Sequence, residues 1–278
     1  MIELFYKSSE ACSKQITRLY STSFFSAIKL LHRDLRQPIY NIYGFVRLAD
    51  EIVDTFHDHN KQQLLSEFKT ETYAAIERKL SLNPVLNSFQ QTINRYDVDL
   101  HLVEAFFHSM ELDLNRTQYD EAGYAEYIYG SAEVVGLMCL YVFCEGDKEL
   151  YQQLKPSAQS LGAAFQKVNF LRDIRADYLG LQRVYFPGCD FNRFTAADKQ
   201  KIEADIAQDF AHAYSGIVQL PPKARFGVYV AYVYYNSLFK RIRKIQPSGI
   251  LRKRVRIPDF TKMLILFRAR LKNQLGAL

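Results

Sequence analysis

The feature that most constrains the fold is a helical periodicity that continues through nearly the whole chain. Apolar residues recur three and four positions apart, and no convincing stretch alternates between apolar and polar residues. The 12 glycines and 8 prolines are scattered among 278 residues, which argues against a flexible linker and a turn-rich β fold. We therefore predict an all-α fold with a single domain spanning residues 1–278.

We expect helices at residues 9–31, 36–56, 61–80, 85–95, 99–113, 124–144, 148–179 (one or two helices), 196–215, 221–246 and 258–274. The stretch 36–56 is apolar on almost every face and has Pro38 near its start, so this helix should lie at the centre of the fold. Residues 183–187 favour a short extended segment that ends at Pro187.

The four cysteines form no CxxC pair and no Cys/His metal spacing, so free thiols in a reducing compartment are expected. The N-terminus lacks a signal-peptide pattern, and we find no run of about 18 or more apolar residues. These features predict a cytoplasmic protein without a membrane span.

The formal net charge of +6 is unevenly distributed. Eight basic residues and no acidic residue lie between Lys240 and Arg256. Such a run is typical of a solvated helix end, and it also suits a phosphorylated substrate or a peripheral contact with the anionic inner face of a membrane. Nucleic acid ranks last, because no nucleic-acid-binding motif accompanies the charge.

Two acidic clusters interrupt sequence that otherwise indicates buried helix. In "RLADEIVD" (47–54) and "NFLRDIRAD" (169–177), two aspartates stand four positions apart. Helical spacing of three and four places two sets of polar residues each on one face: Tyr43, Arg47, Asp50 and Asp54, and Gln166, Asn169, Asp173 and Asp177.

Carboxylates are costly to bury unless a cation compensates them. Carboxylate and amide oxygens with few histidines suit a hard cation, Mg²⁺ above all, and the nearby Arg47 and Arg172 suit phosphate oxygens. One Asp-x-x-x-Asp pair alone is more often a solvated face. Two pairs in apolar surroundings, each with an arginine, favour a site for a metal ion and phosphate oxygens. A di-iron bundle would require Glu-x-x-His, which the sequence lacks.

These clusters and three further segments resemble the squalene/phytoene synthase family of head-to-head prenyltransferases. "YSTSFFSAIKLL" (20–31) is similar to the N-terminal Ser-x-Ser-Phe segment of that family. "YIYGSAEVVG" (127–136) resembles its Tyr-x-Tyr-Gly helix, and "QKVNFLRDIRADYLGLQRVYFP" (166–187) gives the strongest match. The resemblance spans about residues 20–262, and it implies a helical bundle around a central cavity.

The resemblance also implies roles for individual residues. The expected catalytic residues are Arg47, Asp50, Asp54, Tyr129, Asp173 and Asp177. The expected metal ligands are Asp50, Asp54, Asn169, Asp173 and Asp177. Substrate contacts are expected from Ser21, Ser23, Tyr43, Arg47, Gln166, Asn169, Arg172, Arg183, Tyr185, Tyr235, Arg254 and Lys262.

The chain departs from the pattern of the family at four positions. Tyr20 stands where some members have His, and Glu51 replaces one of two adjacent aspartates. Arg175 replaces a small residue and Ala176 replaces a Glu, which together weaken the second acidic cluster.

The resemblance implies condensation of two prenyl diphosphates with Mg²⁺ or Mn²⁺ and, in the bacterial members that it matches best, without NADPH. We expect two geranylgeranyl diphosphates to give phytoene. Two farnesyl diphosphates giving dehydrosqualene, squalene or presqualene diphosphate is the alternative. A non-enzymatic assembly protein with this fold is the alternative of another class, although such relatives are expected to lose the aspartates.

Overall fold

The computed structural model describes residues 1–180, 183–189, 194–250 and 254–274, and of residues 175–180, 259, 273 and 274 only the backbone. Within these ranges the chain is helical, with no strand and one isolated bridge between Gln118 and Val184, inside the expected extended segment. The prediction of an all-α fold is confirmed.

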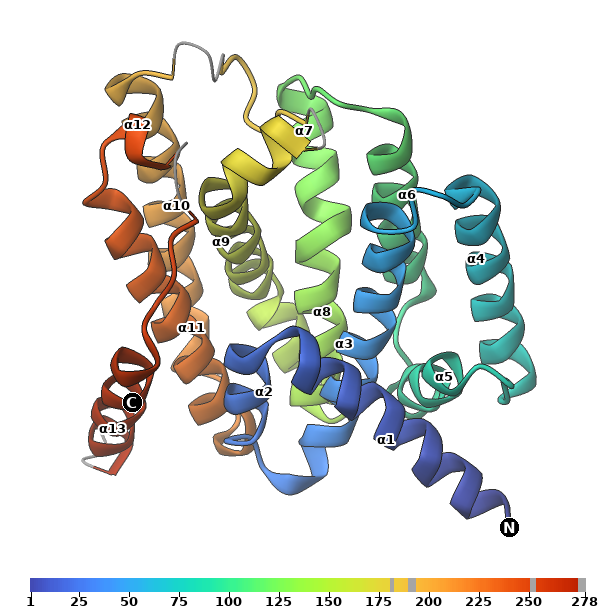
Figure 1. The fold of residues 1–278 in the computed structure, drawn as a ribbon. Helices are drawn as coiled ribbons and strands as arrows, with labels where there is room; N and C mark the ends of the chain where they lie inside the picture. The colour runs from blue at the N-terminus through green and yellow to red at the C-terminus, as the bar shows by residue number, and fades with distance from the viewer. Residues whose placement is uncertain (181–182, 190–193, 251–253, 275–278) are drawn as a thin grey trace.

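The helices follow the sequence prediction closely. They are α1 (Ile2–Tyr20), α2 (Thr22–Ile28), α3 (Arg33–Asp54), α4 (Lys61–Arg78), α5 (Pro84–Tyr96), α6 (Leu100–Asn115), α7 (Glu121–Ile128), the π-helical segment η1 (Tyr129–Glu133), α8 (Val134–Cys144), α9 (Lys148–Gly180), α10 (Ala196–Ile217), α11 (Pro222–Arg243), α12 (Pro247–Ile250) and α13 (Asp259–Gln274). In Figure 1, α3 and α8 run lengthwise through the middle of the molecule, α9 and α11 lie to their left, and α1 and α2 lie in front near the lower end of α3.

Helix α3 lies at the centre, as its apolar faces predict. Leu35, Ile42 and Phe45 are fully buried, and α3 packs against α1, α5 and α8. The Phe45 ring stacks on the Phe89 ring of α5, with centroids 3.8 Å apart. The buried position of α3 lets the acidic cluster toward its carboxyl end line a cavity, where Asp50 and Asp54 stay partly exposed.

The predicted helix at 9–31 is wrong in one respect, because the chain breaks it at Ser21. Ser21 is extended, with φ −145° and ψ 96°, and its hydroxyl accepts a hydrogen bond from the Phe24 backbone nitrogen at 3.2 Å. Serine at this position caps a new helix by satisfying a free N–H of the first turn. The break lets α2 turn toward α3 and α11.

The predicted helix at 124–144 is present but contains the π-helical turn η1. Neighbouring helices approach this turn so closely that only glycine fits. A Cβ atom on Gly130 would lie 2.5 Å from the Ala105 carbonyl oxygen, and one on Gly162 of α9 would lie 2.6 Å from the Ala132 oxygen. The π turn therefore lies wedged between α6 and α9, and such turns are frequent at functional sites.

The combined helical stretch Glu121–Cys144 is long and apolar enough to span a membrane by length and composition, with a mean hydropathy of 1.5 in its most apolar window. Half of that window is buried inside the protein. The stretch packs against α3, α6 and α9, so its apolar character is that of a core helix.

Candidate active site

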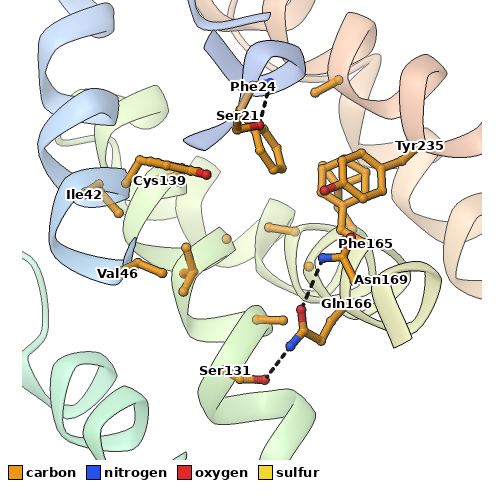
Figure 2. A pocket seen from close by; sticks show the side chains of 18 of the residues that line it. Ser21, Phe24, Ile42, Val46, Ser131, Cys139, Phe165, Gln166, Asn169 and Tyr235 are labelled. Atoms are coloured by element: carbon orange, nitrogen blue, oxygen red, sulfur yellow. Dashed lines mark hydrogen bonds between the residues drawn. The ribbon is translucent and has the colours of Figure 1, made fainter. Parts of the chain in front are cut away.

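A cavity of about 700 Å³ lies among α2, α3, α8, α9 and α11. Its walls are largely apolar. Figure 2 shows Ile42, Val46 and Cys139 on one side and Phe24, Phe165 and Tyr235 across from them. Charged and polar side chains line only part of the cavity: Arg47, Asp50, Asp54, Asp113, Gln166, Asn169, Arg172, Asp173 and Arg254.

The polar and the apolar lining residues lie at opposite ends of the cavity, because each helix changes in character along its length. On α3 the lining changes from Ile39 and Ile42 to Asp50 and Asp54 toward the carboxyl end. On α9 it changes in the same direction, from Leu154 and Ala158 to Asn169 and Asp173, whereas η1 and α8 become apolar toward their carboxyl end. The cavity therefore has a polar mouth, where α3 and α9 end, and an apolar interior.

The first acidic cluster lines the mouth as a set of paired charges. Arg47 pairs with Glu51, and its Nη1 lies 3.7 Å from Asp50 Oδ2. Its guanidinium carbon also lies 4.4 Å from the centre of the Tyr20 ring. Withdrawal from solvent and the neighbouring Asp54 carboxylate raise the pKa of Asp50 to about 7. A cation in the mouth would relieve this unfavourable charge.

The second acidic cluster is held by arginines. The Asp173 carboxylate accepts hydrogen bonds from Arg172 Nη2 at 2.5 Å and from Arg254 Nη2 at 3.3 Å, and its Oδ1 lies 2.7 Å from Arg254 Nε as an ion pair. Gln166 Nε2 lies 3.5 Å from Ser131 Oγ, and Asn169 Nδ2 lies 3.5 Å from Gln166 Oε1, as Figure 2 shows. The side chain of Asp177 lies outside the described residues, so its predicted role stays a prediction.

A buried network around Arg183 and Asp113 holds Asp54 of the first acidic cluster. The sequence analysis named Arg183, which is not among the residues lining the cavity, and missed Asp113. Arg183 donates from Nη1 to Asp54 Oδ1 at 3.0 Å and from Nη2 to the Asp113 backbone oxygen at 2.9 Å. The Asp113 side chain, only 6% exposed, accepts from Tyr127 at 2.6 Å and from Tyr119 at 3.2 Å. Burial raises the pKa of Asp113 to about 6, although Arg183 counteracts it.

Aromatic rings form one wall of the cavity. The Phe165 and Tyr235 rings stack at 4.0 Å, and Phe24 lies 5.5 Å from Tyr235 and 5.9 Å from Tyr43. Burial raises the pKa of both Tyr43 and Tyr235, so both hydroxyls stay protonated at neutral pH. Their π faces offer a site where a positive charge is stabilised without a reactive nucleophile.

Of the remaining residues predicted to contact substrate, some line the cavity and others do not. Ser21 and Tyr185 line the cavity, and Ser23 and Lys262 do not. Lys262 Nζ lies 3.4 Å from Thr22 Oγ1, at the edge of α2.

Tyr129, predicted to lie near the reacting carbons, is not among the lining residues, whereas Tyr127 is. Residues two positions apart on a helix are separated by about 200° around its axis, so Tyr127 and Tyr129 point in nearly opposite directions.

The residues of the mouth fit a divalent cation with a phosphate ligand. Two buried atoms there have no hydrogen-bond partner within the described part of the chain: the donor Arg47 Nε and the acceptor Asn169 Oδ1. Among the described side chains, no three His, Cys, Asp or Glu residues lie close enough together to hold a metal ion. Mg²⁺ commonly takes most of its ligands from water and phosphate, so it does not require such a cluster.

Comparisons with known proteins agree on one family. The squalene/phytoene synthase family model matches residues 17–261. Phytoene synthase of Arthrospira platensis is 27% identical over 95% of this chain and 93% of its own length. The 4,4'-diapophytoene synthase of Staphylococcus haemolyticus is 26% identical, over 70% and 68%. A dehydrosqualene synthase solved with a ligand has a TM-score of 0.85 at 21% identity, covering 98% of both chains.

An all-α fold whose apolar cavity opens at carboxylates and guanidinium groups defines a helical enzyme for ligands with an apolar body and a charged head. The chain belongs to the squalene/phytoene synthase family, and it is a prenyltransferase of that type.

Proposed function

We propose that the protein joins two prenyl diphosphates head to head, with two geranylgeranyl diphosphates giving phytoene and two pyrophosphates, as a step of carotenoid biosynthesis. The observation that carries this proposal is the division of the cavity into a charged mouth and an apolar interior. Such a cavity suits a molecule whose diphosphate must be neutralised while its hydrocarbon chain is kept from water.

The residues of the mouth would assist departure of the diphosphate. Arg47, Arg172 and Arg254 lie where guanidinium groups can bind the oxygens on which negative charge develops. Mg²⁺ or Mn²⁺, when bound by Asp50, Asp54, Asn169 and Asp173, would supply further neutralisation of the leaving group.

The cavity walls would protect the carbon skeleton after ionisation. Ionisation gives an allylic cation, which the double bond of the second substrate captures, and loss of a proton leaves a cyclopropylcarbinyl diphosphate. A second ionisation, rearrangement and proton loss then join the two C1 carbons. The Phe24, Phe165 and Tyr235 rings can stabilise these cations and exclude water. Tyr127, rather than Tyr129, lines the cavity where these steps would occur.

Two observations bear on the chain length of the substrate. Phytoene synthases of Arthrospira platensis and of a Paracoccus species align with 95% and 96% of this chain, which supports a C20 substrate. The farnesyl alternative is supported by the diapophytoene synthase match and by a presqualene diphosphate synthase of Rhodopseudomonas palustris, 28% identical over 67% of the chain. With either substrate, the diphosphate group would bind at the polar mouth of the cavity.

The test is incubation of the protein with labelled geranylgeranyl or farnesyl diphosphate and Mg²⁺, with and without NADPH. We expect a C40 hydrocarbon from the C20 substrate, unchanged by NADPH, abolished by EDTA and restored by Mg²⁺ or Mn²⁺. A higher kcat/KM with the C15 substrate would establish the farnesyl alternative. A folded protein that makes no condensation product from either substrate would support the non-enzymatic alternative.

A further inference from the structure

Helix α13 presents an apolar stripe to the outside of the protein. Phe260, Met263 and Phe267 are 77%, 70% and 60% exposed, and Leu264 and Leu271 are also exposed. At about 100° per residue, these five side chains fall within an arc of about 100°. Large apolar side chains scattered over a surface are common, but a continuous stripe along one helix usually marks an interaction surface.

The opposite face of α13 is fixed to the protein, so the stripe does not result from a loosely attached helix. Ile265 and Ala269 are buried in the main hydrophobic cluster, against α11. Lys272 Nζ donates to the Tyr214 hydroxyl at 2.9 Å, and Lys262 reaches Thr22. These contacts hold the stripe outward.

Two arginines border the stripe. Helical geometry places Arg268 and Arg270 about 80° to either side of its centre, and both are exposed. Long cationic side chains beside an apolar stripe can lie along it and extend their charge to the phosphate level of a bilayer. Four basic residues of α13, against the single acidic Asp259, give the helix a charge complementary to anionic lipid.

A second copy of the chain would fit this surface less well. A symmetric dimer contact pairs identical surfaces, so stripe would meet stripe and the bordering arginines of both copies would be brought together. Like charges across an interface disfavour association. The charges on α13 therefore favour a lipid surface as the occupant.

We infer that α13 is a membrane-docking helix whose stripe enters the headgroup boundary of an anionic bilayer. The inference rests on the proposed function in one respect, because an insoluble hydrocarbon product requires delivery to a membrane. It also assigns membrane contact to a surface other than the basic residues 240–244, which lie at the carboxyl end of α11, away from α13 in Figure 1. At that end of α11, Arg243 Nε lies 3.8 Å from Glu203 Oε2, so its charge already has an acidic partner in the protein.

The experiment is co-sedimentation of the full chain with vesicles of phosphatidylcholine alone or mixed with phosphatidylglycerol. We expect binding to the mixed vesicles, and at least a tenfold weaker affinity for Met263→Glu/Phe267→Glu. Arg268→Gln/Arg270→Gln should lose most of the preference for anionic vesicles. The matched controls are Leu82→Glu, at an exposed leucine between α4 and α5, and Lys14→Gln/Arg33→Gln, at exposed cations of α1 and α3. Both should bind like the wild type.

Absence of wild-type binding to the mixed vesicles would overturn the inference, and so would unchanged binding of the Met263→Glu/Phe267→Glu variant. A wild-type dimer that this variant dissociates, measured by light scattering without vesicles, would assign the stripe to a second copy instead. Condensation activity is assayed separately in detergent. Vesicle binding without any product would contradict the proposed function and leave the docking inference intact.

Discussion

Arg183 Nη1 lies 3.0 Å from Asp54 Oδ1, so a residue that follows the second acidic cluster in sequence binds directly to the first. The arginine is 8% exposed and is held on its other side by Asp113. The orientation of Asp54 in the mouth therefore depends on a segment about 130 positions later in the chain.

Arg183→Lys should lower kcat/KM by about 10- to 100-fold, the equivalent of losing one or two charge-assisted hydrogen bonds. An ammonium group cannot contact Asp54 and the Asp113 backbone oxygen in the same fixed geometry as a guanidinium. Initial rates with labelled substrate measure the effect. Arg116→Lys, at a half-exposed arginine paired with Glu126, is the control and should match the wild type. Equal rates for the two variants would show that Arg183 does not position Asp54.

Asp50→Ala and Asp173→Ala should each reduce turnover at least about a hundredfold, because each removes a carboxylate that is proposed to hold the cation at the leaving group. Asp50→Ala should leave the thermal midpoint unchanged or higher, since the raised pKa shows that its charge is unfavourable in the folded protein. Asp58→Ala, in the exposed segment after α3, is the control for both. Rates and melting curves are the two measurements. Wild-type turnover in either variant would remove the metal assignment.

Tyr127→Phe should lower kcat and destabilise the fold by about 1–3 kcal/mol, because buried Asp113 loses its shortest hydrogen bond. Tyr129→Phe should change neither quantity by much, since Tyr129 lies outside the cavity lining and no side-chain hydrogen bond holds its hydroxyl among the described residues. Steady-state kinetics and urea unfolding of the pair are the measurements. A larger kinetic effect at Tyr129 would support the sequence-based prediction that Tyr129 is the catalytic tyrosine.

Ala158→Leu should reduce kcat/KM for the C20 substrate more than for the C15 substrate. Ala158 lies toward the apolar end of the cavity, where added methyl groups occupy the space of the distal hydrocarbon. Overpacking at such a site costs about 1–3 kcal/mol, so the fold should survive. Ala211→Leu, on the exposed face of α10, controls for the helix substitution. An unchanged ratio of the two kcat/KM values would place the end of the substrate elsewhere.

The stability contribution of Asp113 should depend on pH in a defined direction. Its pKa is raised from 3.8 to about 6, so between these values the folded state binds more protons than the unfolded state. The free energy of unfolding should therefore fall as pH rises from about 4 to 6, by on the order of 3 kcal/mol. Asp113→Asn should remove this part of the slope in urea unfolding at several pH values. Parallel pH profiles for the wild type and the variant would contradict the assigned pKa.

The sequence predicts the long helices well because their apolar patterns are local. It misses the break at Ser21, where one side-chain cap outweighs an otherwise continuous pattern. It also misses η1, because the contacts that hold the π turn come from α6 and α9. These differences come from packing between distant segments, which periodicity does not report.

In the candidate site too, local patterns were predicted and contacts between distant segments were not. Asp50, Asp54 and Asp173 line one cavity, as facing acidic helices would require. Asp113 was missed because it belongs to no Asp-x-x-x-Asp pair, although an aspartate between Leu112 and Leu114 is a signal worth testing. The Tyr-x-Tyr-Gly segment contains two tyrosines, and the sequence does not tell which of them faces the cavity. The structure shows that Tyr127 does and that Tyr129 is not among the lining residues.

The position of the mouth at the carboxyl ends of α3 and α9 also has an electrostatic consequence. Peptide dipoles leave partial negative charge at the end of a helix, and here two such ends add to the aspartates. A free diphosphate approaching this opening would meet repulsion from the carboxylates and the helix ends, opposed by attraction to Arg47, Arg172 and Arg254. The proposed metal ions would offset this negative charge, so the diphosphate should bind more tightly when they are present.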